Sequence, residues 1–294
     1  MTKKITDFLR LIRVNNLIII SLTQVFAYYF LTPSINYHNL LQIDFILLLI
    51  STFLVAAGGY IINDYMDVML DLINKPGKVI VGNTISRRWA MFLHLLINAI
   101  AFILALAINR KIALLVLVCS ICLWLYSQFL KKTYLAGNLL VAGLTAFTIW
   151  ILYLFNPNIM KNGIWVYSLF AFGSTLIREI IKDSEDLRGD QKFKAKTLPI
   201  VIGIRKTKDI LIYLQIILIS LCMVYCSSFV AISYSSQTIF IPFLLYMLGL
   251  VLLPMVAMAW LIKTADVKSD FTRLSLLSKL IMISGIVSMI FWRY

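Results

Sequence analysis

Residues 44–71 read D-F-I-L-L-L-I-S-T-F-L-V-A-A-G-G-Y-I-I-N-D-Y-M-D-V-M-L-D, a long apolar run that ends in three aspartates. Crossing a bilayer takes about 20 mostly apolar residues, so this run predicts a membrane-spanning helix. Residues 163–190 show the same pattern, an apolar run followed by acidic residues. The aspartates correspond at a constant offset of 119 residues: Asp64, Asp67 and Asp71 form the first cluster, and Asp183, Asp186 and Asp190 form the second cluster. Carboxylates beside hydrocarbon are costly unless a cation neutralises them, so both clusters are candidate functional sites.

The rest of the chain is equally apolar. Hydrophobic residues make up 61% of the 294 residues, and the mean hydropathy is +0.92. This composition excludes a soluble domain and predicts an all-α polytopic membrane protein. Pro242 and Pro254 predict a kink in the eighth helix, expected at about 237–262. We expect nine transmembrane helices, at about residues 16–32, 44–62, 89–108, 112–130, 135–155, 163–181, 209–231, 237–262 and 273–292.

Basic residues are distributed unevenly between the two sides of this predicted bundle. The net charge is +14, and 23 of the 27 Lys and Arg residues fall on the side of the N-terminus and of both acidic clusters. The positive-inside rule therefore predicts that the N-terminus and the clusters are cytoplasmic and the C-terminus external, in a bacterial or archaeal cell membrane. A basic rim also suits membrane lipids with anionic headgroups or phosphorylated substrates, and we expect no nucleic-acid partner. The opposite side holds only Arg110, Lys111, Lys161 and Arg293.

The constant offset indicates an internal repeat. It extends beyond the aspartates, since Lys75 corresponds to Lys194. An even number of helices per repeat preserves their orientation, so we expect parallel repeats whose two clusters face one central cavity. The predicted organisation is a single transmembrane domain over residues 1–294, with repeat one at about 1–132, repeat two at about 133–262 and an extra helix at about 273–292.

The spacing of the carboxylates points to a hard metal ion. Residues three and four apart share one helix face, so each cluster forms a stripe of like charge that requires a cation. Oxygen ligands without a His or Cys partner favour Mg²⁺, which binds through one or two carboxylates and completes its shell with water and phosphate oxygens. Facing clusters would clamp a diphosphate. The predicted metal ligands are Asp64, Asp67, Glu179, Asp183 and Asp186.

Basic residues near both clusters can neutralise a departing diphosphate. For each of them, ordinary positive-inside charge is the alternative. A diphosphate at the mouth of an apolar bundle indicates a donor with a lipid tail. An allylic prenyl diphosphate fits, because its carbocation needs shielding from water and is attracted to aromatic faces. The candidate substrate-binding bases are Lys75, Lys78 and Arg88 after the first cluster and Lys182 and Lys194 around the second.

Two motifs resemble those of the UbiA superfamily of intramembrane prenyltransferases: N-D-Y-M-D-V-M-L-D at 63–71 and E-I-I-K-D-S-E-D-L-R-G-D at 179–190, where the first residue is often Asp in the family. The resemblance covers nearly the whole chain. It implies nine helices around a lateral cavity open to lipid, and two Mg²⁺ ions that bind a polyprenyl diphosphate. It also implies that Asn63 contacts substrate.

Further positions match the same superfamily. Arg13 and Asn16 resemble an N-terminal R-P-x-N element near the active site, with Val14 in the place of the proline. Tyr126 and Lys131 resemble a Tyr and a Lys at the exit of the fourth helix. The resemblance implies substrate binding by the first pair and a catalytic role for the second.

Within the superfamily, the segments D-L-I-N-K-P at 71–76 and K-T-L-P-I at 196–200 look like the digeranylgeranylglyceryl phosphate synthase branch. That likeness implies transfer of a geranylgeranyl group to a hydroxyl of a lipid-soluble acceptor, a prenylglyceryl phosphate. A carboxylate such as Asp71 or Asp190 can remove the proton of the hydroxyl.

Three other functions stay open at this point. An aromatic quinone precursor can replace the glyceryl phosphate as acceptor, since likeness to a branch is an analogy about the acceptor. A terpene cyclase of the same fold would use the carbocation internally. A transporter is suggested by parallel repeats, but the acids lie at one mouth of the bundle.

Overall fold

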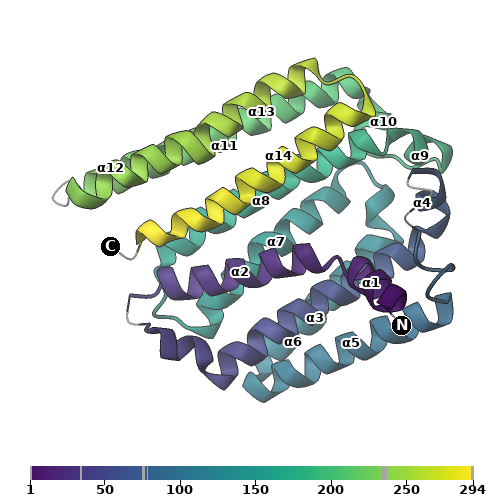
Figure 1. The fold of residues 1–294 in the computed structure, drawn as a ribbon, viewed down its shortest axis with the longest axis horizontal. Coiled ribbons are helices and arrows are strands. Elements are labelled where there is room, and N and C mark those ends of the chain that lie inside the picture. Colours follow the sequence, from purple (N-terminus) through teal and green to yellow (C-terminus); the bar gives the residue numbers. More distant parts are fainter. Residues whose placement is uncertain (1, 34, 75–76, 78, 234–236, 293–294) are drawn as a thin grey trace. The chain divides into compact units, whose positions relative to one another are not determined.

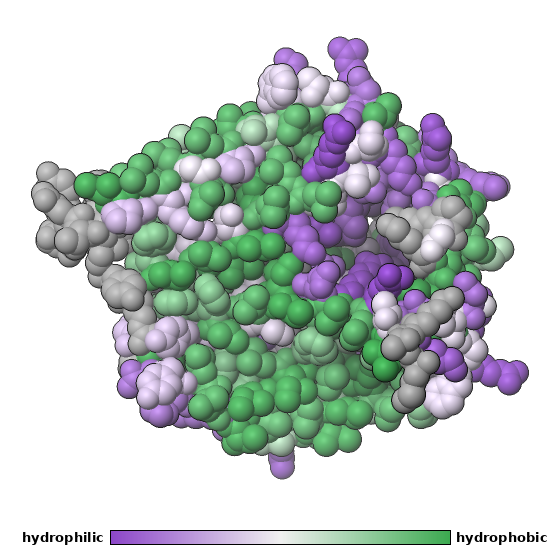
Figure 2. Space-filling model, in the orientation of Figure 1, coloured by the Kyte–Doolittle hydropathy of each residue, from purple (hydrophilic) through white to green (hydrophobic). Residues whose placement is uncertain are grey.

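The structure is a computed structural model that describes residues 2–33, 35–74, 77, 79–233 and 237–292. Over these ranges the chain is almost entirely helical, with a single isolated bridge between Val81 and Ile85. Eight helices are long and apolar enough to cross a membrane, or up to nine if a bent N-terminal pair counts as one span. The predicted all-α membrane fold is confirmed, and the protein is an integral membrane protein. Figure 2 shows mostly hydrophobic side chains over the long helices.

The chain forms two compact units, and the first comprises residues Met1–Val25, Ile35–Leu140 and Arg188–Ala195. In this unit α3 packs against both α5 and α6 (Figure 1). Its elements are α1 (Thr2–Leu11), the start of α2 (Val14–Phe30), η1 (Tyr37–Leu41), α3 (Ile43–Met66), α4 (Val68–Asn74), α5 (Arg87–Ile108), α6 (Arg110–Gln128), η2 (Leu130–Lys132), the start of α7 (Ala136–Phe155) and α9 (Leu187–Lys192).

Two adjacent glycines explain how α3 packs so closely on its neighbours. A Cβ at Gly59 would lie 2.8 Å from a methyl carbon of Leu123 on α6, and a Cβ at Gly58 would overlap the amide of Asn98 on α5. Small residues let helix backbones approach in a membrane, where van der Waals packing rather than the hydrophobic effect drives association. The A-A-G-G run of α3 therefore fixes the end of the helix that carries the first cluster.

The second unit comprises Phe26–Ser34, Val141–Leu187 and Lys196–Tyr294. Within it α8 packs against α11 and α14, and α13 packs against α11 and α14 (Figure 1). Besides the remainder of α2 and α7, its elements are α8 (Lys161–Glu185), α10 (Leu198–Ile202), α11 (Ile204–Ser233), α12 (Gln237–Tyr246), η3 (Met247–Leu252), α13 (Leu253–Thr264), α14 (Lys268–Val287) and η4 (Ser288–Trp292).

The helix expected at 237–262 is interrupted, in line with its prolines. It consists of α12, a π-helical turn in η3 and α13, with Pro254 in the first turn of α13. A proline has no N–H to donate, so the preceding turn must change its hydrogen-bond register. The buried Gln215 of α11 donates from Nε2 to the carbonyl of Met255 over 3.1 Å, which ties the helix to α11 just past the interruption.

The two acidic motifs have the same local conformation. Asp67 caps the C-terminus of α3 with φ −92° and ψ 3°, and Asp186 caps α8 with φ −93° and ψ 9°. The N–H of each donates to the carbonyl four residues earlier, on Asn63 and on Lys182. A short helix follows in both cases, α4 and α9. The internal repeat itself stays a prediction that rests on the sequence offset.

Candidate active site

The first cluster lies at the C-terminal end of α3. The carbonyls that end a helix present partial negative charge, so carboxylates here are destabilised by about 0.3–1 kcal/mol unless a cation lies nearby. Asp64 and Asp67 both occupy this unfavourable position. The structure supplies a basic side chain to each of them, from opposite ends of the first unit's sequence.

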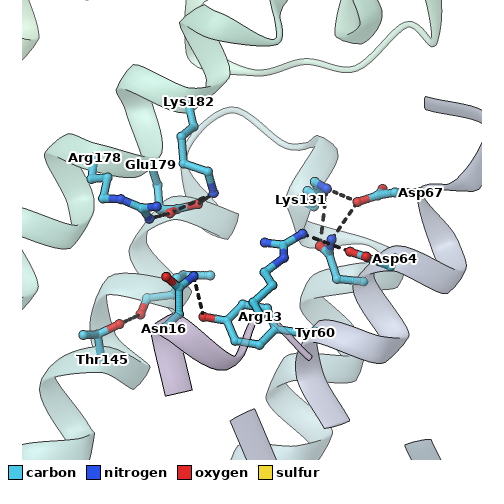
Figure 3. A network of polar contacts seen from close by, with 12 residues as sticks. Arg13, Asn16, Tyr60, Asp64, Asp67, Lys131, Thr145, Arg178, Glu179 and Lys182 are labelled. Carbon is cyan, nitrogen blue, oxygen red and sulfur yellow. Dashed lines mark hydrogen bonds and ion pairs between the residues drawn. The ribbon is translucent and has the colours of Figure 1, made fainter. Parts of the chain in front are cut away.

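Lys131 is the partner of Asp67 (Figure 3). The Asp67 side chain is almost fully buried, and its Oδ2 accepts hydrogen bonds from Lys131 Nζ and, over 2.9 Å, from Asn63 Nδ2. Lys131 also donates to Asn63 Oδ1 over 3.3 Å, which closes a triangle of three side chains. Burial lowers the pKa of Lys131, but the charge and hydrogen bond of Asp67 outweigh it, so the net pKa is raised. Lys131 therefore stays cationic.

Arg13 is the partner of Asp64. Its Nη2 donates to Asp64 Oδ1 over 2.9 Å, and its guanidinium carbon lies 4.9 Å from the centre of the Tyr60 ring. Asn16 Nδ2 donates to the Tyr60 hydroxyl over 3.4 Å. Figure 3 shows these side chains gathered at the junction of α1 and α2 and the end of α3. The structure thus brings Arg13, Asn16, Asn63 and Lys131 together with the first cluster.

The backbone conformation of Arg13 explains how its side chain reaches Asp64. Arg13 adopts φ 52°, a left-handed conformation that is unfavourable by roughly 1–2 kcal/mol for a residue with a Cβ. It separates α1 from α2, whose axes differ by 52°. Hydrophobic packing of Leu11 and Ile12 against α3 residues holds this bend in place. The bend directs the guanidinium to the end of α3.

In the second unit, Glu179 of α8 lies between two bases. Arg178 Nη1 approaches its Oε1 at 3.0 Å, and Lys182 Nζ lies 3.1 Å from both of its oxygens (Figure 3). Asp183 and Asp186 follow in the last turns of the same helix, half-buried. The sequence analysis did not single out Arg178 as a partner of Glu179. The sequence did contain a signal for this pair, since Arg178 is a basic residue next to an acidic one in an otherwise apolar helix.

Asp190 belongs to the first unit, whereas the other acidic residues of its motif belong to the second. The segment Arg188–Ala195 groups with α4, because Gly189 is pressed against Asn74, whose amide a Cβ would overlap. Asp190 is buried, whereas Lys194 is exposed and adopts φ 54°. Asp71 of α4 contributes to the electrostatic field at Lys131. The two candidate bases, Asp71 and Asp190, are therefore in one unit with the first cluster.

The other predicted residues lie near the ends of α5 and α6 or beyond the part of the chain that the structure describes. Arg88 lies on the exposed face of α5, in an open groove that it forms with Trp89 and Phe92. Tyr126 is half-buried near the end of α6, five residues before Lys131. Two predicted bases, Lys75 and Lys78, lie outside the described residues.

The donor set fits Mg²⁺. Within the described ranges, no three His, Cys, Asp or Glu side chains converge as a metal site, and the four cysteines are free thiols elsewhere in the helices. Mg²⁺ does not need such a convergence, since one or two carboxylates suffice when substrate phosphates supply further ligands. Asp64 and Asp67, three residues apart at one helix end, match that requirement. In the structure, their oxygens accept hydrogen bonds from Arg13 and Lys131.

Known proteins match this chain over most of its length. The model of the UbiA prenyltransferase family matches residues 21–281. A digeranylgeranylglyceryl phosphate synthase of Saccharolobus solfataricus is 38% identical over 215 residues, which cover 72% of this chain and 74% of the relative. The synthase of the same name from Sulfurisphaera tokodaii is 29% identical over 272 residues, 89% of each chain.

Solved structures show the same fold. A structure of a digeranylgeranylglyceryl phosphate synthase aligns with a TM-score of 0.66 at 22% identity, over 98% of this chain and 99% of the other. A UbiA homolog from Archaeoglobus fulgidus, bound to GPP and Mg²⁺, aligns with a TM-score of 0.61 at 19% identity, over 96% of this chain and 99% of the other. At these identities the likeness concerns the fold.

Proposed function

Because the chain belongs to the UbiA prenyltransferase family and is a prenyltransferase, we propose that it transfers a geranylgeranyl group to a hydroxyl of a prenylglyceryl phosphate. The observation that carries the acceptor assignment is the name shared by the relatives from Saccharolobus and Sulfurisphaera, digeranylgeranylglyceryl phosphate synthase. The donor is a prenyl diphosphate. The acceptor is a lipid that reaches the site from the membrane.

Arg13 and Lys131, which pair with carboxylates of the first cluster, hold the leaving group in this proposal. Arg13 and Lys131 carry donors that match phosphate oxygens, and both are already oriented by carboxylates and, for Lys131, by Asn63. Mg²⁺, bound by the carboxylates, supplies Lewis-acid stabilisation of the charge that develops on the diphosphate. We propose one ion for each acidic cluster, two in all.

Transfer then breaks the allylic C–O bond, and the electron pair leaves with the diphosphate. The acceptor oxygen forms the new C–O bond and loses its proton to a carboxylate, for which Asp71 and Asp190 are the candidates. A hydroxyl is a weak nucleophile, so substantial ionisation of the donor must precede its attack. Arg13 and Lys131 favour that ionisation because their charges face the leaving group.

The anionic acceptor is testable with a matched panel. With geranylgeranyl diphosphate as donor, geranylgeranylglyceryl phosphate is expected to yield an ether lipid. The corresponding unphosphorylated geranylgeranylglycerol is expected to react at least about tenfold more slowly, because it lacks charge-assisted hydrogen bonds to basic residues. Mass spectrometry of the extracted lipids measures both products. If an uncharged phenol or naphthol is prenylated efficiently while the phosphate-bearing lipid stays inert, the acceptor is aromatic instead.

The orientation in the membrane is a further part of the proposal. The basic asymmetry places both acidic clusters on the cytoplasmic side. In a variant whose four native cysteines are replaced, a thiol at the exposed Lys192 is expected to react in intact cells only with membrane-permeant reagents. A thiol at the exposed Lys111, on the opposite side, is the matched control and should react with impermeant reagents. The reverse pattern would invert the assigned topology.

A further inference from the structure

The carboxylates proposed to hold Mg²⁺ already have cationic partners, each on one of the two carboxylate oxygens. Arg13 Nη2 lies 2.9 Å from Asp64 Oδ1, and Lys131 Nζ bonds to Asp67 Oδ2. Asp67 Oδ2 also accepts from Asn63 Nδ2 over 2.9 Å. A carboxylate oxygen offers about two lone pairs, so this oxygen has its full complement of partners.

A metal ion and a base therefore compete for the same carboxylate, and at Oδ2 of Asp67 they compete for one oxygen. To bind Asp67 through Oδ2, Mg²⁺ has to displace Lys131, whose side chain is only 27% exposed. Displacement without a new partner would leave a largely buried ammonium without a counter-charge beside a divalent cation. This state is unfavourable because a buried charge has lost its hydration and because the two positive charges repel. Mg²⁺ competes with Arg13 for Asp64 in the same way, although this ion pair is more exposed.

A diphosphate removes this obstacle. Its oxygens accept hydrogen bonds from guanidinium and ammonium groups at least as well as a carboxylate does. If Arg13 and Lys131 turn from the carboxylates to the diphosphate, the carboxylate oxygens become available to the metal ion that accompanies it. No group is left unpaired in the exchanged state.

We infer that Arg13 and Lys131 exchange partners during substrate binding, and that this exchange makes metal binding depend on the diphosphate. The inference rests on the proposed function, because it takes Asp64 and Asp67 as the metal ligands. Coupling is reciprocal, so Mg²⁺ raises affinity for the diphosphate by the same factor as the diphosphate raises affinity for Mg²⁺. The enzyme then holds its metal only together with its donor.

Removal of a base should consequently have opposite effects on the two ligands. In Lys131→Gln the Asp67 carboxylate loses its competitor, so affinity for a metal ion alone rises by about tenfold, within the range typical of coupled sites. Affinity for the diphosphate falls, because one of its donors is gone. A purely structural role for Lys131 would instead weaken the binding of both ligands.

The measurement uses Mn²⁺ as a paramagnetic probe on the purified full-length protein in detergent, with free ion followed by electron paramagnetic resonance. We expect weak Mn²⁺ binding to the unmodified protein and about tenfold tighter binding to Lys131→Gln and to Arg13→Gln. Arg13→Asn is a second variant at that position, because asparagine tolerates the left-handed backbone. Lys132→Gln and Arg10→Gln remove the same charge from exposed neighbours and should leave Mn²⁺ affinity unchanged.

Calorimetry with geranylgeranyl thiolodiphosphate, a poorly reactive donor, completes the test. Mg²⁺ should raise its affinity strongly in the unmodified protein and much less in Lys131→Gln. Equal Mn²⁺ affinity in the unmodified protein and both base variants would overturn the exchange and leave prenyl transfer intact. If tight Mn²⁺ binding by Lys131→Gln survives the addition of Asp64→Asn and Asp67→Asn, these carboxylates are not the ligands, and the proposed chemistry of the first cluster fails as well.

Discussion

Replacing Asp67 with alanine is expected to lower the rate of prenyl transfer by about 100- to 1,000-fold. Asp67 is 3% exposed, and its carboxylate anchors both Lys131 and Asn63. The substitution removes a metal ligand and also leaves Lys131 without the partner that orients it. The measurement is the initial rate of radiolabelled lipid formation, with thermal unfolding of the same preparation as a check of the fold.

Two further variants separate function from stability. Asp67→Asn keeps the size and part of the hydrogen bonding of the side chain, so it should fold well and still lose most activity. Asp266→Ala removes a carboxylate that is 83% exposed and paired with Lys208, and its rate should match that of the unmodified enzyme. A rate for Asp67→Ala within about threefold of the unmodified enzyme would show that Asp67 contributes no transition-state stabilisation.

Asp186→Ala is expected to have an effect of similar size, about 100-fold or more. Asp186 ends α8 in the conformation in which Asp67 ends α3, so its carboxylate also lies at the negative end of a helix and favours a cation. Steady-state assays at varied Mg²⁺ are the appropriate measurement. The variant should have a lower maximal rate that excess Mg²⁺ does not restore.

The neighbouring acid provides the matched control. Glu185 accepts a hydrogen bond from Thr272 of α14 over 2.9 Å, so its carboxylate is committed to a contact between helices. Glu185→Ala changes the charge of the same motif by the same amount, and its activity should remain close to that of the unmodified enzyme. Equal losses in Asp186→Ala and Glu185→Ala would mean that the motif acts through its net charge rather than through a specific ligand.

Hydropathy predicted the existence of the membrane helices better than their ends. The spans expected at 44–62 and 163–181 lie within α3 and α8, which continue to Met66 and Glu185. A span predicted from hydropathy ends where charged residues begin, whereas the backbone hydrogen bonds of the helix continue into the polar region. The helices therefore extend into each acidic motif and end at Asp67 and Asp186.

The N-terminal span shows a different limit. The expected helix at 16–32 is α2, which starts at Val14 because Arg13 interrupts the helical backbone. Left-handed backbone at an arginine has no signal in composition or periodicity. It follows from packing of the adjacent Leu11 and Ile12, which only the folded chain brings to α3.

The chemistry of the candidate site could be predicted from residue types, but its pairing could not. Spacing predicted that each aspartate triplet lies on one face of a single helix. That prediction is wrong for the last member of each triplet, because α3 ends at Asp67 and α8 ends at Asp186, while Asp71 and Asp190 lie on the separate short helices α4 and α9. The contact between Lys131 and Asp67 joins residues distant in the chain, and so does the packing of Gly189 on Asn74. Such contacts arise from tertiary structure. For the same reason, the sequence did not predict that Glu179 lies between Arg178 and Lys182.

The most direct test of the account is the stoichiometry of prenyl transfer in one reaction. Purified protein in lipid vesicles is given geranylgeranyl diphosphate, geranylgeranylglyceryl phosphate and Mg²⁺, and the released diphosphate and the ether product are quantified together. We expect equal amounts of diphosphate and ether product, no diphosphate release without acceptor, and none when the divalent metal is chelated. Diphosphate release without acceptor, accompanied by a hydrocarbon product, would contradict it and indicate a cyclase.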